Sequence, residues 1–117
     1  MTELTKINIQ QILITPPILE MALELNPILN TYYLTLAKAT ENDGFGLNRM
    51  EYMMEADFEK LLIKEPIVLK RLVNKDGNRI GKVINGQKKQ LYEIIDGRHR
   101  VCRAIIEMMT EIECKIL

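Results

Sequence analysis

The N-terminal part of the chain passes from a strand-like to a helix-like pattern of apolar residues. Ile7 and Ile9 alternate with polar residues, and residues 12–14 then form an apolar run, which together predict a first β-strand. Thr15 followed by Pro16 indicates a helix start, because threonine serves as an N-cap and proline fits the first helical position. The segment ILEMALELN that follows is therefore expected to form a short helix.

Two further apolar stripes follow at helical spacing. Asn26 and Pro27 repeat the cap-and-proline signal, so Pro27 is expected to separate two helices or to kink one. The first stripe consists of Ile28, Leu29, Tyr32, Tyr33, Leu36 and Ala37, and the second of Met50, Met53, Met54, Phe58, Leu61 and Leu62. Between them, residues 41–48 (ENDGFGLN) have the composition of a loop. That loop is either a plain connection or a flap over a ligand around Phe45.

The C-terminal half consists of short strand patterns that are separated by turn signals. Strands are predicted from Ile67 to Val73, over RIGKVI, and from Gln90 to Ile95. The segments KDGN and Asn85-Gly86 indicate tight turns, so residues 74–90 are expected to form a hairpin that projects from the body.

A helix and a closing strand end the chain. The predicted helix buries Val101, Cys102, Ala104, Ile105, Met108 and Met109 on a broad face. The segment EIECKIL is expected to be a strand with Ile112, Cys114 and Ile116 on one face. The whole pattern predicts an α+β fold over residues 1–117 as one domain, with a small mixed sheet and a hairpin insertion at about 74–90.

The composition is that of an ordinary globular protein, and 117 residues suit a single domain. No secretory leader is visible, and no apolar run approaches the roughly 20 residues that span a bilayer. We therefore expect a cytoplasmic protein without membrane contact, in the host cytoplasm if it is encoded by a virus or plasmid. Cys102 and Cys114 lack metal-ligand spacing and are interpreted as core thiols, with a redox role or a disulfide as the alternative.

The charges are unevenly distributed although they sum to zero. Residues 66–103 contain ten Lys or Arg and three Asp or Glu, whereas residues 1–65 have a net charge of −5 and residues 104–117 of −2. An anionic partner is thus expected near the basic segment. Its hairpin carries Lys75, Arg79, Lys82, Lys88 and Lys89, which either face solvent or track a nucleic-acid backbone.

The segment LYEIIDGRHRVCRAIIEMM contains the chemistry of most interest. Asp96 is predicted to be the N-cap of the last helix, and Gly97 to permit a close approach of backbone to ligand. The amides that follow, from Arg98 to Arg100, lie at a helix end that attracts anions. Two arginines and His99 oppose the helix dipole there by a few tenths to about 1 kcal/mol each unless an anion compensates them. The sequence therefore predicts a phosphate site.

The alternative is that the arginines face water or pair with Asp96 or Glu93, which contributes little at a surface. Arg103 lies one turn beyond His99 and is expected either to widen the basic patch or to pair with Glu107. His99 is the only histidine, so a metal site is not expected. His99 and Asp96 are the candidates for a catalytic role, and phosphate contact is the simpler role for His99.

The succession of PIVLKR, YEIIDGRHRVCRAIIEM and EIECKIL resembles the ParB/sulfiredoxin superfamily. The matching residues of the turn are Asp96, Gly97, His99, Arg100 and Ala104. The resemblance covers about residues 66–117 without the hairpin, and INIQQILI fits the usual first strand. It implies a nucleotide-phosphate site in which Gly97, Arg98, His99 and Arg100 contact ATP, ADP or CTP, with Mg²⁺ as a companion ion.

The departures from the family are informative. Sulfiredoxin has a catalytic cysteine directly before the His-Arg pair, where this chain has Arg98, so sulfinic-acid reductase activity is not expected. Partition proteins read DNA through a following helix-turn-helix domain, so a full partition protein is not expected unless the chain is a fragment. Kinases of the superfamily use an acidic base, for which Glu20 or Glu24 would be candidates, although an exposed helix glutamate is the plainer interpretation. The small ParB-like nuclease proteins are the most similar group.

Three functions follow as hypotheses. The first is a nucleotide-binding NTPase or phosphotransferase in which Arg98 and Arg100 neutralise phosphate charge. The second is a DNA-binding protein or nuclease that uses the basic hairpin. The third is a non-catalytic interaction module that contacts its partner through the hairpin and the loop around Phe45.

Overall fold

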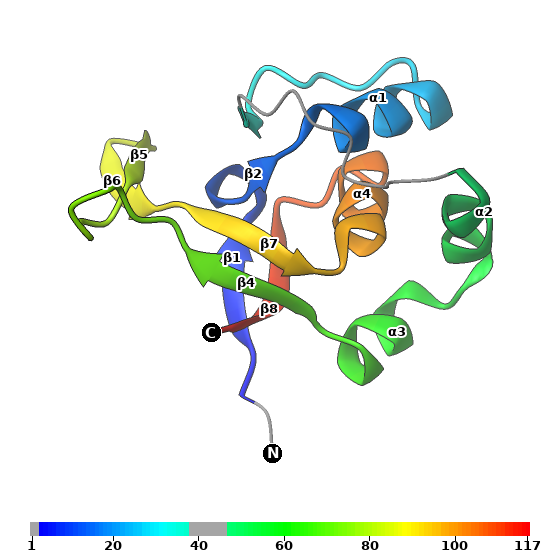
Figure 1. Cartoon of the computed structure of the whole chain (residues 1–117). Helices are drawn as coiled ribbons and strands as arrows, with labels where there is room; N and C mark the ends of the chain where they lie inside the picture. Colours follow the sequence, from blue (N-terminus) through cyan, green and yellow to red (C-terminus); the bar gives the residue numbers. More distant parts are fainter. Residues whose placement is uncertain (1–2, 38–46) are drawn as a thin grey trace.

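A mixed four-stranded sheet organises the fold (Figure 1). The computed structural model describes residues 3–37 and 47–117. The strand order is β1 (Thr5–Asn8), β8 (Glu111–Ile116), β4 (Ile67–Arg71) and β7 (Tyr92–Asp96). Strands β1 and β8 are antiparallel, β8 and β4 are parallel, and β4 and β7 are antiparallel. The predicted α+β class with a small mixed sheet is therefore confirmed.

Helix α4 (Arg98–Ile106) lies at the centre of the molecule. Helix α1 (Pro16–Leu25) and helix α2 (Leu47–Glu55) both pack against it, and it also contacts β4 of the sheet (Figure 1). Every residue from Arg100 to Ile106 is buried, which requires cover on all sides of the helix. No helix within residues 3–37 and 47–117 has the length and apolar character to cross a membrane.

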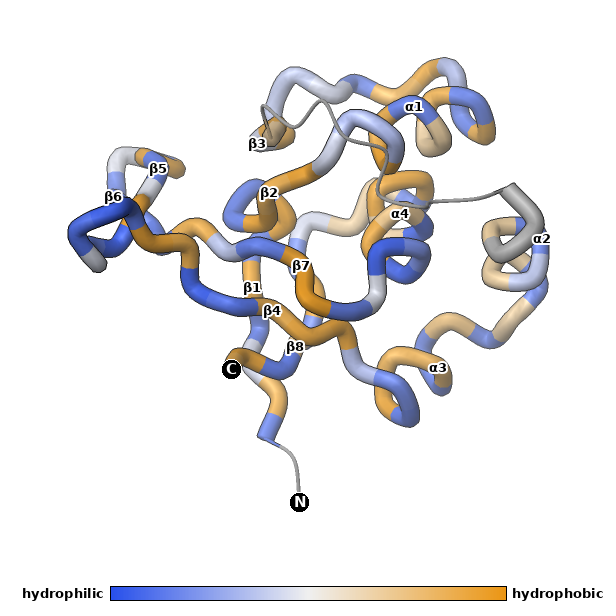
Figure 2. Tube along the Cα trace, viewed as in Figure 1, coloured by the Kyte–Doolittle hydropathy of each residue, from blue (hydrophilic) through white to orange (hydrophobic). Residues whose placement is uncertain are grey.

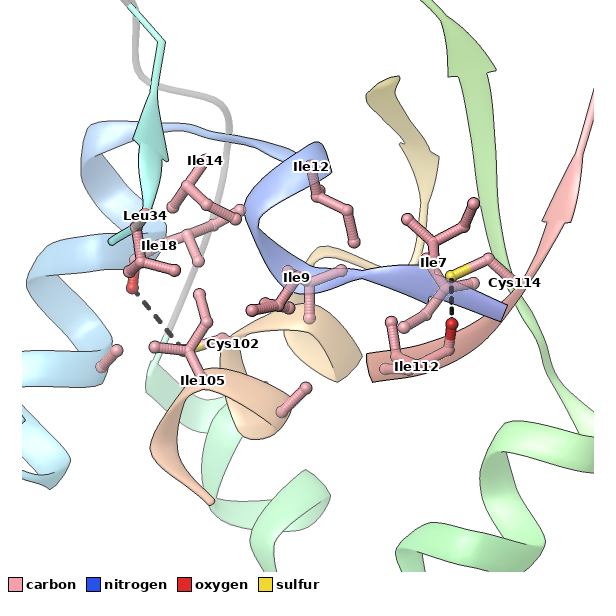
Figure 3. Packing of buried hydrophobic residues seen from close by; sticks show 14 of the residues in the cluster. Ile7, Ile9, Ile12, Ile14, Ile18, Leu34, Cys102, Ile105, Ile112 and Cys114 are labelled. Atoms are coloured by element: carbon pink, nitrogen blue, oxygen red, sulfur yellow. Dashed lines mark hydrogen bonds between the residues drawn. The ribbon is translucent and has the colours of Figure 1, made fainter. Parts of the chain in front are cut away.

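Isoleucine side chains from the N-terminal segment, the sheet and α4 form about half of the core (Figure 3). Burial alternates along β8, where Ile112 and Cys114 are buried and their neighbours Glu111 and Glu113 are exposed, as the sequence predicted. Cys102 and Cys114 are both free and buried. Burial raises the pKa of each thiol to about 12, and Glu113 adds to the effect at Cys114. The interpretation of both cysteines as core thiols is confirmed.

The predicted first strand is interrupted. It consists of β1, a 3₁₀ turn η1 (Ile9–Gln11) and a short strand β2 (Leu13–Ile14). The side chain of Asn8 accepts from the amide of Gln10 at 2.9 Å, and the side chain of Gln11 accepts from the amide of Asn8 at 3.1 Å. Such side-chain bonds to nearby backbone compete with strand pairing, and they end β1 here. The turn lets Ile9 and Ile12, three residues apart, both enter the core.

The helix expected after Pro27 is absent, and that prediction is wrong. Residues 27–34 form turns, and the short strand β3 (Thr35–Leu36) then pairs with β2 in parallel. Asn30 accepts from the amide of Tyr32 at 3.1 Å, which offers the backbone an alternative to a helix. Tyr32 is 98% exposed, so the apolar stripe does not mark a buried face.

The methionine-rich stripe belongs to two helices rather than one. Helix α2 ends at Glu55, and helix α3 (Phe58–Lys64) begins after Asp57, whose side chain accepts from the amide of Lys60 at 3.4 Å. Met50 and Phe58 are buried as expected, whereas Met54 is exposed. The predicted loop at 41–48, with its possible flap around Phe45, lies almost entirely outside the described residues.

The predicted hairpin forms from β5 (Gly81–Ile84) and β6 (Gln87–Gln90) and projects from the sheet (Figure 1). Asn85 and Gly86 have φ angles of 52° and 80°, which are the positive values that a two-residue hairpin turn of type I′ requires. The preceding turn closes around Asn74, whose side chain accepts from the amides of Asp76 and Asn78, both at 2.9 Å. Both predicted turns are confirmed, but the strand expected from Gln90 to Ile95 divides into β6 and β7.

One side-chain amide holds the root of the hairpin. Nε2 of Gln90 donates to the carbonyl oxygens of Leu72, Ile80 and Leu91, at 3.0, 3.1 and 2.8 Å. The backbones of the same three residues bond to one another in a ring, from Leu72 N to Leu91 O, from Leu91 N to Ile80 O and from Ile80 N to Leu72 O. These bonds therefore fix the hairpin to the sheet at the junction between the two.

Candidate functional site

The turn between β7 and α4 is built around Gly97. This residue, and not Asp96, is the N-cap of α4, with a left-handed φ of 102°. A Cβ at this position would lie 3.1 Å from Cγ1 of Ile67 and 3.2 Å from the guanidinium carbon of Arg100, so glycine fits best. The predicted capping role of Asp96 is wrong, because Asp96 is the last residue of β7. Its side chain instead pairs with Arg100 at 3.3 Å.

The amides of the first turn of α4 point out of the helix. The first bond within the helix runs from the amide of Val101 to the carbonyl of Gly97 at 2.9 Å. The amides of residues 98–100 consequently have no acceptor within α4, as in any helix N-terminus. The helix dipole adds partial positive charge there. The end of a helix with these groups favours an anion.

A cavity of about 430 Å³ opens in front of this turn. The residues that line it are Tyr52, Met53, Glu65, Ile95, Asp96, Gly97, Arg98, His99 and Arg100. The lining therefore has a polar part, formed by the turn and Glu65, and an apolar part, formed by Tyr52, Met53 and Ile95, and we call these two parts the polar and the apolar wall. Tyr52 is 79% and Ile95 51% exposed, so their apolar surfaces are available to a ligand. The volume is within the range of roughly 300–1,000 Å³ that is typical of ligand pockets.

Arg98 and His99 are brought together at this cavity. Both line it, and both are half-buried. Nε2 of His99 is buried in the protein, so this nitrogen faces away from solvent. Arg98 is less buried than Arg100, so more of its side chain can contact a ligand in the cavity.

Arg100 has a different position from the one the sequence suggested. Its side chain is only 10% exposed, and its guanidinium donates to the carbonyl oxygens of Glu65 and of Pro66, the latter at 3.0 Å. It also pairs with Asp96, whose side chain is 70% exposed. Two of these acceptors follow directly after α3, at the negative end of its dipole. Arg100 therefore fixes the approach of α3 to β4, and it lines the cavity from a position that is already engaged.

Arg103 repeats this arrangement one turn later. Its guanidinium donates to the carbonyl oxygens of Met53 and Ala56, both at 2.6 Å, at the C-terminal end of α2. It lies 4.7 Å from the centroid of the Phe58 ring. Nε of Arg103 is 3.3 Å from a carboxylate oxygen of Glu107, but without hydrogen-bond geometry, so we treat this contact as a charge pair only. The predicted pairing with Glu107 is observed, whereas the guanidinium points to α2 and not into the cavity at His99.

These contacts account for two of the cations of α4. Arg100 and Arg103 face the carbonyl ends of α3 and α2, where cations are favourable. Arg100 opposes the dipole of α4, and the carbonyl end of α3 compensates it, whereas Arg103 lies in the last turn of α4, where a cation also suits the dipole of α4 itself. Arg98 lies in the first turn of α4 and is half-buried.

A second cavity, of about 480 Å³, shares part of its lining with the first. Glu65, Asp96 and Arg100 line both cavities, and Pro66, Val68 and Lys115 complete the second one. Asp96 and Lys115 both pair in register with Val68, so the three residues form a row across β7, β4 and β8. Neighbours in such a row point to the same face of a sheet. Asp96 thus lines both cavities, together with Arg100.

The predicted nucleic-acid contacts of the hairpin do not all behave alike. Lys75, Arg79, Lys88 and Lys89 are exposed. Lys82 is half-buried, and its Nζ donates to the carbonyl of Tyr33 at 3.2 Å and to the hydroxyl of Thr35 at 2.8 Å. Lys82 therefore ties the hairpin to the start of β3 and to Tyr33 just before it. The sequence could not reveal this role because the two segments are distant along the chain.

The described residues contain no group of three or more His, Cys, Asp or Glu side chains that could hold a metal ion. Glu20 and Glu24, the candidates for an acidic base, lie on the exposed side of α1. The carboxylates at the cavity are instead those of Glu65 and Asp96. Glu65 and the apolar wall formed by Tyr52, Met53 and Ile95 were not expected from the sequence.

Comparison of the chain with models of protein families, with curated proteins and with solved structures gave no match. Its function therefore has to be inferred from the geometry of the turn and its cavity.

Proposed function

We propose that this chain is a nucleotide-binding protein of ParB/sulfiredoxin-like type, with its phosphate site at the turn between β7 and α4. The observation that supports the proposal is the division of the cavity into a polar and an apolar wall. The polar wall is the start of α4 with Arg98 and His99, and the apolar wall includes Tyr52 and Ile95. A nucleotide has the same division, between charged phosphates and a flat base.

Each wall has a distinct task in this proposal. The start of α4 and Arg98 bind a phosphate, because they combine the positive end of a helix dipole with a charged, forked side chain. Gly97 lets the turn adopt its left-handed φ of 102°, where a Cβ would press against Ile67 and Arg100. Tyr52 offers a ring on which a base can stack. Arg100 positions the turn through its hydrogen bonds to the carbonyl oxygens of Glu65 and Pro66, and its positive charge attracts the phosphate.

We further propose that the reaction, if the site is catalytic, is phosphoryl transfer to water or to an acceptor. Catalysis of this kind depends mainly on positioning and on neutralising the charge of the phosphates. Mg²⁺ usually binds through the phosphates and one or two carboxylates, and Glu65 and Asp96 are the carboxylates at the cavity. Asp96 would then exchange part of its contact with Arg100 for the ion.

The experiment is a thermal-shift titration with ATP, ADP, CTP and GTP, each with and without Mg²⁺. A ligand at about 100 times its Kd adds about 2.7 kcal/mol, which corresponds to a rise in Tm of roughly 10 °C for a domain of this size. Arg98→Gln should reduce the shift severalfold, whereas the matched control Arg71→Gln, at an exposed position on β4, should not.

Two results would count against the proposal. One is the lack of any shift with millimolar nucleotide. The other is an equal loss of the shift in the Arg98 and Arg71 variants, which would mean that binding depends on overall charge and not on the turn. Release of inorganic phosphate from the nucleotide that binds best then separates a binding protein from an enzyme.

A further inference from the structure

The hairpin β5–β6 concentrates positive charge away from the nucleotide site. Residues 74–90 contain five Lys or Arg and one acidic residue, Asp76. Four of these cations are exposed, namely Lys75, Arg79, Lys88 and Lys89. The hairpin projects from one end of β4 and β7, and the turn at Gly97 lies at the other end (Figure 1). Hydrophilic residues dominate the projecting ribbon, most of all along β6 (Figure 2).

The hairpin is anchored at three points, which distinguishes it from a loose, solvated arm. Gln90 closes its root through three carbonyl oxygens. Nε2 of Gln11 donates to the carbonyl of Gln90 at 3.0 Å, which joins the root to η1. Lys82 ties the first strand to Tyr33 and Thr35. The ribbon is thus ordered before any partner arrives, so binding does not have to supply that order.

The two faces of the ribbon differ in what they present. Lys82 pairs in register with Lys89, and Val83 pairs with Lys88, so each pair shares a face. The first face is the one held to the body through Lys82. On the second face Val83 is 66% exposed beside the exposed Lys88. A small apolar side chain beside one lysine therefore points to solvent.

We propose that this ribbon is a docking surface for double-stranded DNA. Strands of a ribbon lie about 4.8 Å apart, and the major groove of B-DNA, about 12 Å wide, admits a two-stranded ribbon. Lys75, Arg79 and Lys88 contact phosphates at the groove edges, and Val83 faces the bases, where it can touch a thymine methyl group. The major groove of duplex RNA is too narrow and deep for side chains to read, so RNA is the poorer partner.

The test is the fluorescence anisotropy of a labelled DNA duplex of about 20 base pairs, titrated with the full chain at several salt concentrations. Three phosphate contacts predict a slope of about −2.7 in a plot of log Kobs against log salt. The affinity then falls about 40-fold between 50 and 200 mM salt. Nucleotide is omitted from the assay, so the outcome is independent of the site at Gly97.

Two triple variants separate the hairpin from general charge. Lys75, Lys88 and Lys89 are replaced by glutamine in one, which should leave a slope of about −0.9. Lys6, Lys60 and Lys64 are replaced in the matched control, which removes the same charge from exposed positions on β1 and α3 and should keep the original slope. Circular dichroism and Tm verify that both variants are folded.

Three results would overturn the proposal. The first is the absence of DNA binding at about 50 mM salt with protein up to roughly 100 µM, since nonspecific DNA binding is stronger than this. The second is an equal reduction of the slope in both triple variants. The third is binding of duplex RNA as tight as that of DNA, which would show that charge alone and not the groove determines the interaction.

Discussion

Replacing Arg100 by glutamine tests whether this arginine stabilises the fold or serves a ligand. The substitution removes a guanidinium that donates to the carbonyl oxygens of Glu65 and Pro66 and pairs with Asp96. The shorter amide of glutamine does not extend to the chain that follows α3. If the contacts of Arg100 are structural, the variant should be less stable even when no ligand is present.

The expected loss follows from the acceptors. A hydrogen bond from a charged donor contributes about 1.5–3 kcal/mol, and we take the lower value for each carbonyl because water can reach this region in the variant. The pair with Asp96 adds at most about 1 kcal/mol, since the Asp96 side chain is 70% exposed. The total is about 3–4 kcal/mol, which is a large part of the 5–15 kcal/mol that is typical of whole domains.

Urea unfolding followed by circular dichroism measures this difference. The midpoint should fall while the m value stays constant, because the surface exposed on unfolding is unchanged. The control Arg71→Gln, at an exposed position of β4, should remain within about 0.5 kcal/mol of the parent. A loss below about 1 kcal/mol for Arg100→Gln would refute the reasoning, and it would mean that the guanidinium is available to a ligand at little cost.

Two further predictions concern Gln90 and the cysteines. Gln90→Glu places a carboxylate, which has no donor, against three carbonyl oxygens. The free energy of unfolding, measured with urea, should therefore fall by about 2–4 kcal/mol at neutral pH. A loss that does not diminish below about pH 4, where the acid is protonated, would contradict this account. Cys102 and Cys114 should not react with a thiol reagent at pH 8 until urea unfolds the chain, and rapid labelling of the native protein would show that the core opens easily. The pKa of each thiol rises on folding from 9.0 to about 12, so the contribution of the thiols to stability is complete below pH 9 and is lost between pH 9 and 12. The loss in the free energy of unfolding is about 1 kcal/mol per thiol at pH 10. A variant with both Cys102→Ala and Cys114→Ala should lack this part of the loss at alkaline pH.

The elements that the sequence predicted well are those with local determinants. The hairpin turn needs only Asn85 and Gly86, whose backbone angles are available to few other residues. The burial of Ile112 and Cys114 follows from the alternation of a strand that has one covered face. The helix start beyond Gly97 was also recognisable, although the cap was placed one residue too early.

The errors arose where long-range or backbone contacts decide the structure. The stripe from Ile28 to Ala37 has helical spacing, but Asn30 forms a local turn and Thr35 donates its hydroxyl to the carbonyl of Gln10 at 2.7 Å. The apolar wall of the cavity depends on where α2 lies. The position of α2 depends on the hydrogen bonds from Arg103 to the carbonyl oxygens of Met53 and Ala56. Because every residue has a backbone carbonyl, the sequence does not show which ones accept these bonds. The pattern of side chains therefore contains no signal for the wall.

The way in which α4 holds its neighbours has an evolutionary consequence. Arg100 and Arg103 donate hydrogen bonds to main-chain carbonyl oxygens, which every amino acid supplies. These hydrogen bonds therefore do not depend on the identity of the residue that accepts them. Side chains in the last turns of α2 and α3 are consequently free to drift under selection for a new ligand while the scaffold stays in place. As long as these two arginines are kept, the side chains that face the cavity can change without loss of the scaffold.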